Sequence, residues 1–104
     1  MKIKILLVAT TIILAGRVAW AADAGENWTK NCASCHGKDG SGNTLMGKKF
    51  GIKDYHDPKV QADLTDDQAF NIIKNGKDKM KSFKDKLTDP EIKALVTYIR
   101  GFKK

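Results

Sequence analysis

The chain has 104 residues, with 19 lysine and arginine residues against 12 aspartate and glutamate residues and a formal net charge of +7. The charged residues among the first 21 are Lys2, Lys4 and Arg17, so residues 22–104 hold 16 basic and 12 acidic residues, a net charge of +4. This length leaves room for one domain, and so small a charge argues against nucleic-acid binding.

The first 21 residues have the pattern of a secretory signal peptide. Lys2 and Lys4 form a positively charged start, residues 5–16 are an apolar core, and Ala19 and Ala21 are small residues at the positions that a signal peptidase reads. The apolar run is shorter than the about 20 residues that span a bilayer. We therefore expect cleavage after Ala21 or one residue later, export to a bacterial periplasm, and a mature domain, residues 22–104, without stable membrane insertion.

A first helix is expected directly after this leader. Asp23 followed by Glu26 is a capping-box pattern, and Trp28 is the large apolar anchor of the segment. The stretch from residue 37 to residue 63 holds five of the nine glycines and one of the two prolines, and no helical or strand period is sustained there. We expect this stretch to be ordered loop with at most one helical turn.

A second helix is expected to begin at Thr65, whose hydroxyl can cap the helix while Gln68 reaches back to the Thr65 backbone. The helix should end at Gly76 in the left-handed conformation that glycine tolerates. The apolar residues that it would bury are Phe70, Ile72 and Ile73.

The third helix has the clearest signals. Thr88 is the expected N-cap, Pro90 lies in the first turn, and Glu91 completes a capping box. Its apolar residues recur at helical spacing: Ile92, Leu95, Val96 and Ile99. The first and third helices should cover each other's apolar faces. Because no run of residues alternates as a strand would, the predicted fold class is all-α with long loops.

Residues 32–36 read CASCH, and the chain has no other cysteine. A disulfide here would close a loop too small to add much stability. A redox dithiol is expected after a strand, and a zinc site would need a fourth ligand, for which His56 is a candidate. These alternatives are weaker than covalent haem attachment, of which Cys-x-x-Cys-His is the signature.

The spacing of the motif suits this chemistry. Cys32 and Cys35 lie about one helical turn apart, so both sulfurs can form thioethers with the vinyl groups on one edge of a porphyrin. His36 then points its imidazole at the iron. A domain of this size gains only a few kcal/mol of stability from its hydrophobic core. A buried, covalently attached haem would supply the additional stabilisation that such a small domain needs.

The second axial ligand decides between electron transfer and ligand chemistry. Met80 is the expected ligand, because it is an otherwise unexplained methionine in a polar segment, and a thioether favours Fe(II) and raises the reduction potential. The alternatives are Met46, His56, a lysine such as Lys79 or Lys81, and an open site.

The mature sequence resembles the small class I cytochromes c over essentially its whole length. The resemblance rests on Gly25 and Trp28 in the first helix and on three segments: CASCHG, MGKKFGIKDY and MKSFKDKLTDPEIKALVTYIRGF. It implies a cytochrome c fold, with three main helices and long loops around one covalently attached haem c. It also implies that Gly25 lets the first helix cross closely against the last, near Leu95 and Tyr98.

Carried over to the matching positions, the resemblance makes Cys32 and Cys35 the haem attachment sites, His36 the proximal iron ligand and Met80 the distal one. Many members of the family follow the ligand methionine with proline, where this chain has Lys81, so we expect a less rigid loop and a more easily broken Fe–S bond.

A second departure concerns the proximal histidine. Many members have a proline after the haem motif, with a nearby carbonyl that accepts the imidazole Nδ1–H, whereas this chain has Lys48 in that region and no proline. Some acceptor for His36 is expected, but the sequence does not identify it.

With both axial positions filled, the protein is expected to be a monomeric one-electron carrier between redox proteins and not an enzyme. The alternative is a haem-based module that binds or senses a small ligand when Met80 is displaced. The apolar pocket is expected to be lined by Phe50, Leu64, Phe70, Ile73, Phe83, Leu87, Leu95 and Ile99.

Lysines gather on either side of Met80, and they predict a positive rim that docks to acidic patches on the redox partners. These residues are Lys74, Lys77, Lys79, Lys81, Lys84 and Lys86.

Overall fold

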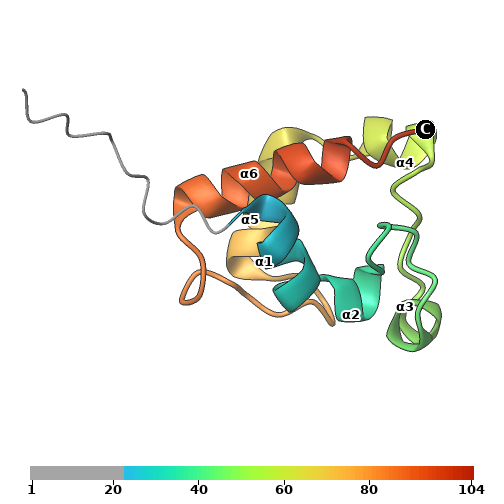
Figure 1. Cartoon of the computed structure of the whole chain (residues 1–104), viewed down its shortest axis with the longest axis horizontal. Coiled ribbons are helices and arrows are strands. Elements are labelled where there is room, and N and C mark those ends of the chain that lie inside the picture. The colour runs from blue at the N-terminus through green and yellow to red at the C-terminus, as the bar shows by residue number, and fades with distance from the viewer. Residues whose placement is uncertain (1–22) are drawn as a thin grey trace, which may run out of the picture.

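The computed structural model describes residues 23–104 (Figure 1). The predicted leader, with its cleavage site, lies outside these residues. The described part folds into six helices without a strand: α1 (Ala24–Asn31), α2 (Ala33–His36), α3 (Leu45–Phe50), α4 (Pro58–Asp63), α5 (Asp66–Asn75) and α6 (Asp89–Arg100). The all-α prediction is confirmed. None of the described helices combines the length and apolar character needed to cross a membrane.

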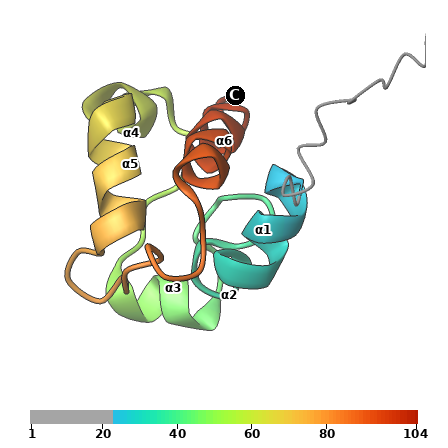
Figure 2. The same ribbon diagram turned by 90° about the vertical axis from the view of Figure 1, so that its left-hand side faces the viewer.

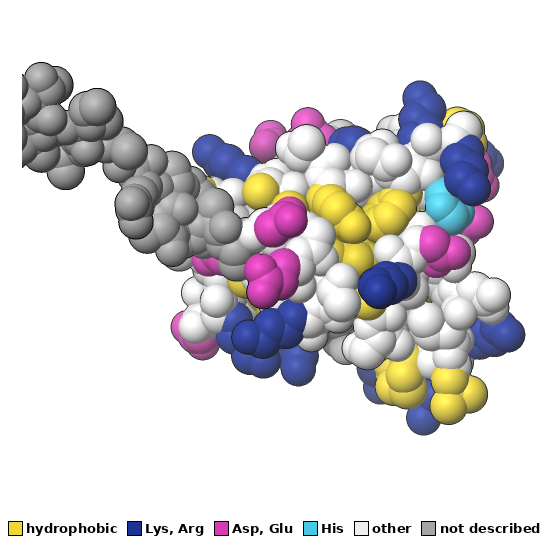
Figure 3. Space-filling view, viewed as in Figure 1, with side chains coloured by type: hydrophobic (Ala, Val, Ile, Leu, Met, Phe, Trp, Pro, Cys, Tyr) yellow, Lys and Arg dark blue, Asp and Glu magenta, His cyan; other side chains and the backbone are white. Residues whose placement is uncertain are grey.

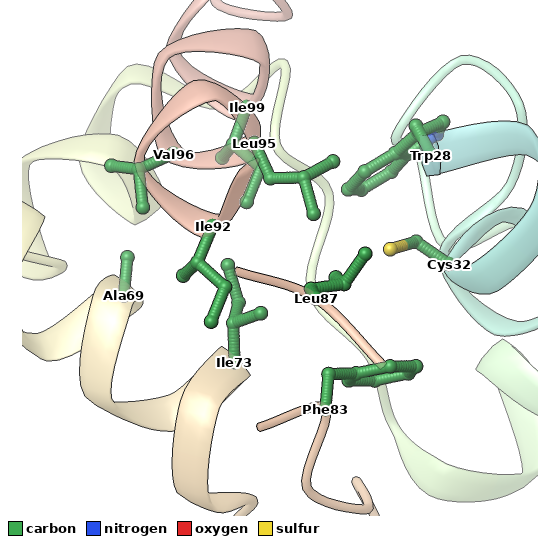
Figure 4. Packing of buried hydrophobic residues seen from close by; sticks show 10 residues of the cluster. All are labelled: Trp28, Cys32, Ala69, Ile73, Phe83, Leu87, Ile92, Leu95, Val96 and Ile99. Atoms are coloured by element: carbon green, nitrogen blue, oxygen red, sulfur yellow. The ribbon is translucent and has the colours of Figure 1, made fainter. Parts of the chain in front are cut away.

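The core forms where α6 packs against both α1 and α5 (Figures 1 and 2). Trp28 of α1 and Ile92 and Leu95 of α6 are the large side chains buried most completely. The expected packing of the first helix on the last is therefore confirmed. The whole cluster, drawn in Figure 4, comprises Trp28, Cys32, Ala69, Ile73, Phe83, Leu87, Ile92, Leu95, Val96 and Ile99.

The helix caps follow the sequence signals closely. Thr65 and Gln68 form the expected capping box of α5, and Thr88 and Glu91 form that of α6. Asp23 caps α1 by accepting a hydrogen bond from the Gly25 N–H at 3.0 Å.

The end of α5 differs in detail from the prediction. Gly76 has the expected positive φ of 81°, but its ψ of 166° lies outside the left-handed helical region. The chain therefore leaves the helix in an extended direction instead of curling under it. A side chain at this position would collide with the backbone, because a Cβ on Gly76 would lie 2.7 Å from the Met80 carbonyl oxygen.

The prediction of a loop with at most one helical turn over residues 37–63 was wrong, because α3 and α4 lie in this stretch. Thr44 caps α3 through its hydroxyl, which accepts from the Gly47 N–H. Asp57 caps α4, and Pro58 occupies its first turn. Each helix has six residues, too few for a hydrophobic period to be visible, so only their caps identify them.

A polar contact joins the α1–α6 crossing. The Asn27 Nδ2 donates to Glu91 Oε2 at 3.1 Å, so the residue that completes the capping box of α6 also binds α1. The backbone bond from Thr88 and the bond from Asn27 hold the pKa of the Glu91 carboxyl below its ordinary value.

The resemblance implied that Gly25 allows α1 to cross closely against α6, and the structure agrees with this only in part. This residue does lie beside Tyr98, but a Cβ added to it would be 3.5 Å from the Tyr98 Cε2, an ordinary van der Waals contact. The crossing therefore does not require glycine at this position.

Candidate haem site

A cleft with largely apolar walls opens beside the core and is partly open to solvent. It brings together Cys32, His36 and Met80, of which the last is far from the others in sequence. The residues that line it are Trp28, Cys32, His36, Tyr55, Leu64, Ala69, Ile72, Ile73, Met80, Leu95 and Ile99.

The two cysteines lie on successive turns at the junction of α1 and α2. The His36 N–H donates to the Cys32 carbonyl at 3.0 Å, so the CASCH segment forms a helical turn as its spacing suggests. Cys32 is buried, with 7% of its surface exposed, and Cys35 is half-buried. In Figure 4 the Cys32 sulfur points into the interior, toward Leu87.

The pKa of the Cys32 thiol argues against a redox dithiol. Burial, reinforced by the neighbouring Cys35, raises the pKa of the Cys32 thiol to about 11. A reactive dithiol needs a lowered thiol pKa, because the thiolate is the nucleophile. The zinc alternative is not supported either, since the described residues hold no group of three or more potential ligands among His, Cys, Asp and Glu.

His36 lines the cleft, and its ring lies in a cluster with the rings of Trp28 and Tyr55, which also contact each other. It stacks on Tyr55 at a centroid distance of 5.4 Å and an angle of 15°, and its centroid lies 5.5 Å from that of Trp28. Burial lowers the pKa of the imidazole, which keeps it neutral, the form that can bind a metal.

The carbonyl acceptor expected for His36 is absent from the described residues. The Nδ1 atom is buried and has no hydrogen-bond partner there. The expectation of a protein acceptor for the Nδ1–H is therefore not met among these residues. Two thiols on one helical turn and a neutral imidazole on the wall of an apolar cleft are nevertheless the donor set that a covalently attached haem needs.

Side chains from before and after the motif bind carbonyl groups at its C-terminal end. The Trp28 Nε1–H donates to the Gly37 carbonyl at 2.9 Å, and the Thr44 hydroxyl donates to the Cys35 carbonyl at 2.6 Å. Gly47 of α3 fits so tightly here that a Cβ on it would lie 2.7 Å from the Cys35 carbonyl oxygen. The position of α2 is thus fixed by α1 on one side and α3 on the other.

The candidates for the distal ligand lie in very different surroundings. Met80 is half-buried, packs against the core and lines the cleft. Met46 projects from α3, whose exposed apolar side chains appear at the lower right of Figure 3, and it does not line the cleft. The His56 Nδ1 lies 2.9 Å from the Asp54 carboxylate, also away from the cleft. Lys79 and Lys81, which flank Met80 in the sequence, are exposed.

The predicted pocket lining was half correct. The predicted residues that do line the cleft are Leu64, Ile73, Leu95 and Ile99. The predicted residues that lie elsewhere are Phe50, Phe70, Phe83 and Leu87; of these, Phe83 and Leu87 are buried in the core. The lining residues that the sequence did not identify are Trp28, Tyr55, Ala69 and Ile72. The one signal for Tyr55 was an aromatic residue in an otherwise polar stretch.

Comparison with known proteins agrees with this site. The family model described as "Cytochrome C oxidase, cbb3-type, subunit III" matches residues 19–99. The solved structure of "KustC0563 c-type cytochrome" is 38% identical, with a TM-score of 0.74, and the match covers 79% of this chain and 99% of that one. The structure of a point mutant of Kustc0563 is also 38% identical, with a TM-score of 0.70 and coverage of 78% and 99%.

No curated protein gives a significant match. The family model nevertheless spans most of the chain, and the solved structures share its fold and are 38% identical to it over the aligned part. The chain therefore belongs to this cytochrome family and is a small c-type cytochrome.

Proposed function

We propose that the protein is a one-electron carrier with a single haem c, attached through Cys32 and Cys35 and ligated at its iron by His36 and Met80. The observation that carries the proposal is the cleft itself, in which Cys32, His36 and Met80 meet between apolar walls. The chain has a single Cys-x-x-Cys-His motif, which supports one haem.

A haem bound in this cleft supplies a one-electron couple at its iron. The protein contributes the surroundings of that couple. Trp28 and Tyr55 pack against the ring of His36, and the aliphatic side chains of α5 and α6 give the cleft apolar walls. Filling both axial positions with protein ligands leaves no place for a substrate, which supports electron transfer and not catalysis.

Attachment is tested by the intact mass of the protein after denaturation. We expect the wild type to keep the mass of one haem, and the double variant Cys32→Ala/Cys35→Ala to lose it completely, because thioethers alone survive denaturation. Ser34→Ala is the matched control, since Ser34 is an exposed residue between the two cysteines. Haem retained by the double variant, or wild type without haem, would contradict the proposal.

We further propose that the protein acts in the periplasm. The attachment of haem through thioethers is completed outside the cytoplasm, so a haem-binding motif implies export. The charged start and apolar core of residues 1–21 supply an export signal. The same mass spectrum gives the first residue of the exported protein: a chain that begins at Ala22 or Asp23 supports the proposal, and a chain that keeps residues 1–21 contradicts it.

The redox partners are proposed to dock at a positive rim formed by lysines that follow α5. Of the six lysines predicted for it, Lys74 is half-buried and paired with Asp89 at 3.1 Å. The others are exposed, and we define the lysine rim as these five residues: Lys77, Lys79, Lys81, Lys84 and Lys86. With Asp78 and Asp85 in the same segment, the rim has a net charge of +3.

An electrostatic rim should act mainly on the association rate. With an acidic one-electron protein as reductant, we expect Lys79→Glu to lower the second-order rate constant at low salt by about threefold or more, an effect that disappears at high salt. Lys59→Glu makes the same charge change on α4, away from the rim (Figures 1 and 2), and should leave the rate nearly unchanged. Equal effects of the two variants would show that only net charge matters.

A further inference from the structure

Met80 lies in a closed loop that is bound to the C-terminal end of α5. The last carbonyl groups of a helix lack partners within the helix, and here the returning chain supplies them. The Phe83 N–H donates to the Ile73 carbonyl at 3.0 Å, and the Lys84 N–H donates to the Lys74 carbonyl at 3.1 Å. We call residues 76–84 the Met80 loop; these two bonds join its end to α5.

The tip of the Met80 loop is closed by a second pair of bonds. The Lys77 N–H donates to the Met80 carbonyl, and the Met80 N–H donates to the Lys77 carbonyl, both at 2.9 Å. Asp78, between them, has a positive φ of 53°. The backbone of Met80 is thus fixed to Lys77, while the bonds at Ile73 and Lys74 fix the far end of the loop.

Ser82 joins the returning segment of the Met80 loop to the end of α5. Its hydroxyl donates to the Lys74 carbonyl at 2.5 Å, and its oxygen also accepts from the Lys84 N–H at 3.4 Å. It stands two residues after Met80 and directly after Lys81, the residue found where many class I cytochromes c have proline. A proline would restrict the backbone after the methionine by its fixed φ. In this chain, the hydrogen bond from the Ser82 hydroxyl to the Lys74 carbonyl restrains the same stretch.

We infer that Ser82 is a positioning residue for Met80: its hydrogen bond to the end of α5 restrains the chain after the methionine and keeps the thioether in the cleft. The inference rests on the proposed function, because it assigns a role to Ser82 only if Met80 binds the iron. It is an alternative to the sequence-based expectation of a less rigid loop: bonds to α5 would replace the restraint that proline supplies in other members.

The test is displacement of Met80 from ferric haem-loaded protein by added imidazole, followed through the long-wavelength absorption band of methionine-bound ferric haem. We expect Ser82→Ala to increase the apparent affinity for imidazole about fivefold, the effect of losing one neutral hydrogen bond. Amide hydrogen exchange at the Met80 N–H, measured in the reduced protein, should become faster by a similar factor.

Two further variants make the result specific. Ser82→Thr keeps the hydroxyl at an exposed position and should restore wild-type behaviour in both measurements. Thr29→Ala removes a comparable bond, from the Thr29 hydroxyl to the Gly25 carbonyl at 2.9 Å on α1, and should change neither. A methionine band in wild type with less than a twofold effect of Ser82→Ala would overturn the inference alone. No methionine band in wild type would refute the Met80 ligation and the inference together.

Discussion

Replacing Gly47 by alanine should destabilise the haem-loaded protein by about 3 kcal/mol or more, at the upper end of what overpacking a buried position costs. A Cβ at this position would lie 2.1 Å from the Gly42 carbonyl oxygen and 2.7 Å from that of Cys35. Both obstacles are backbone atoms, so no rotation of a side chain can relieve the collision. The helix α3 would have to move away from the haem motif. Denaturant-induced unfolding, followed by haem absorbance and by circular dichroism, measures the loss.

Gly25→Ala is the matched control for this prediction. A Cβ on Gly25 would make only an ordinary contact with Tyr98, at 3.5 Å, and alanine favours the helix that Gly25 occupies. We expect the variant to be between neutral and about 1 kcal/mol more stable than wild type. If Gly25→Ala were instead the damaging change and Gly47→Ala the harmless one, the α1–α6 crossing would be tighter, and the packing of α3 on α2 looser, than the structure has them.

Sequence reasoning located the helices that begin at a side-chain cap and continue with a regular apolar period. Thr88, Glu91 and the apolar residues of α6 specify one another locally, so the prediction needs no knowledge of the rest of the fold. The short helices α3 and α4 lack this regularity. Their formation depends on packing: α3 is placed by the contact of Gly47 with the carbonyl groups of Gly42 and Cys35, a tertiary fact that no local pattern contains.

The same division holds for the site. The CASCH motif is local, and together with the absence of a preceding strand and of a clear fourth ligand it favoured haem over the alternatives. The walls of the cleft are not local: Tyr55 reaches His36 because the Gln61 side chain donates to the Tyr55 carbonyl at 2.7 Å and to the Ile99 carbonyl at 2.9 Å. This ties the loop before α4 to the end of α6. A buried glutamine in a short helix offers no sequence signal for such a role, so Tyr55 could not be assigned to the cleft in advance.

The different surroundings of Met46 and Met80 also could not be predicted without the structure. In the sequence, Met46 and Met80 both stand in polar, lysine-rich segments. In the fold they are opposites: Met46 is 36% exposed on the outer side of α3, whereas Met80 packs against the core and lines the cleft. The difference arises because the Met80 loop is bound back onto α5 through the Phe83 and Lys84 amides.

Met80→Ala should therefore lower the reduction potential on the order of 0.1 V, a part of the about 0.8 V range that axial ligands set, and should open the iron to carbon monoxide in the ferrous state. Loss of the soft thioether removes the ligand that favours Fe(II). Potentiometric titration and carbon monoxide binding, followed by absorbance, measure the two effects.

Met46→Ala is the matched control, because it removes the same side chain from an exposed site; its potential and its resistance to carbon monoxide should equal those of wild type. The reverse pattern, with Met46→Ala opening the iron and Met80→Ala leaving it closed, would require α3 to turn its outer face toward the haem. The backbone of Gly47 packs so closely on the haem motif that a Cβ there would lie 2.7 Å from the Cys35 carbonyl oxygen, so that rotation would break the contact that positions the haem motif itself. The assignment of the distal ligand and the packing of α3 on α2 therefore depend on each other, and these two variants test both at once.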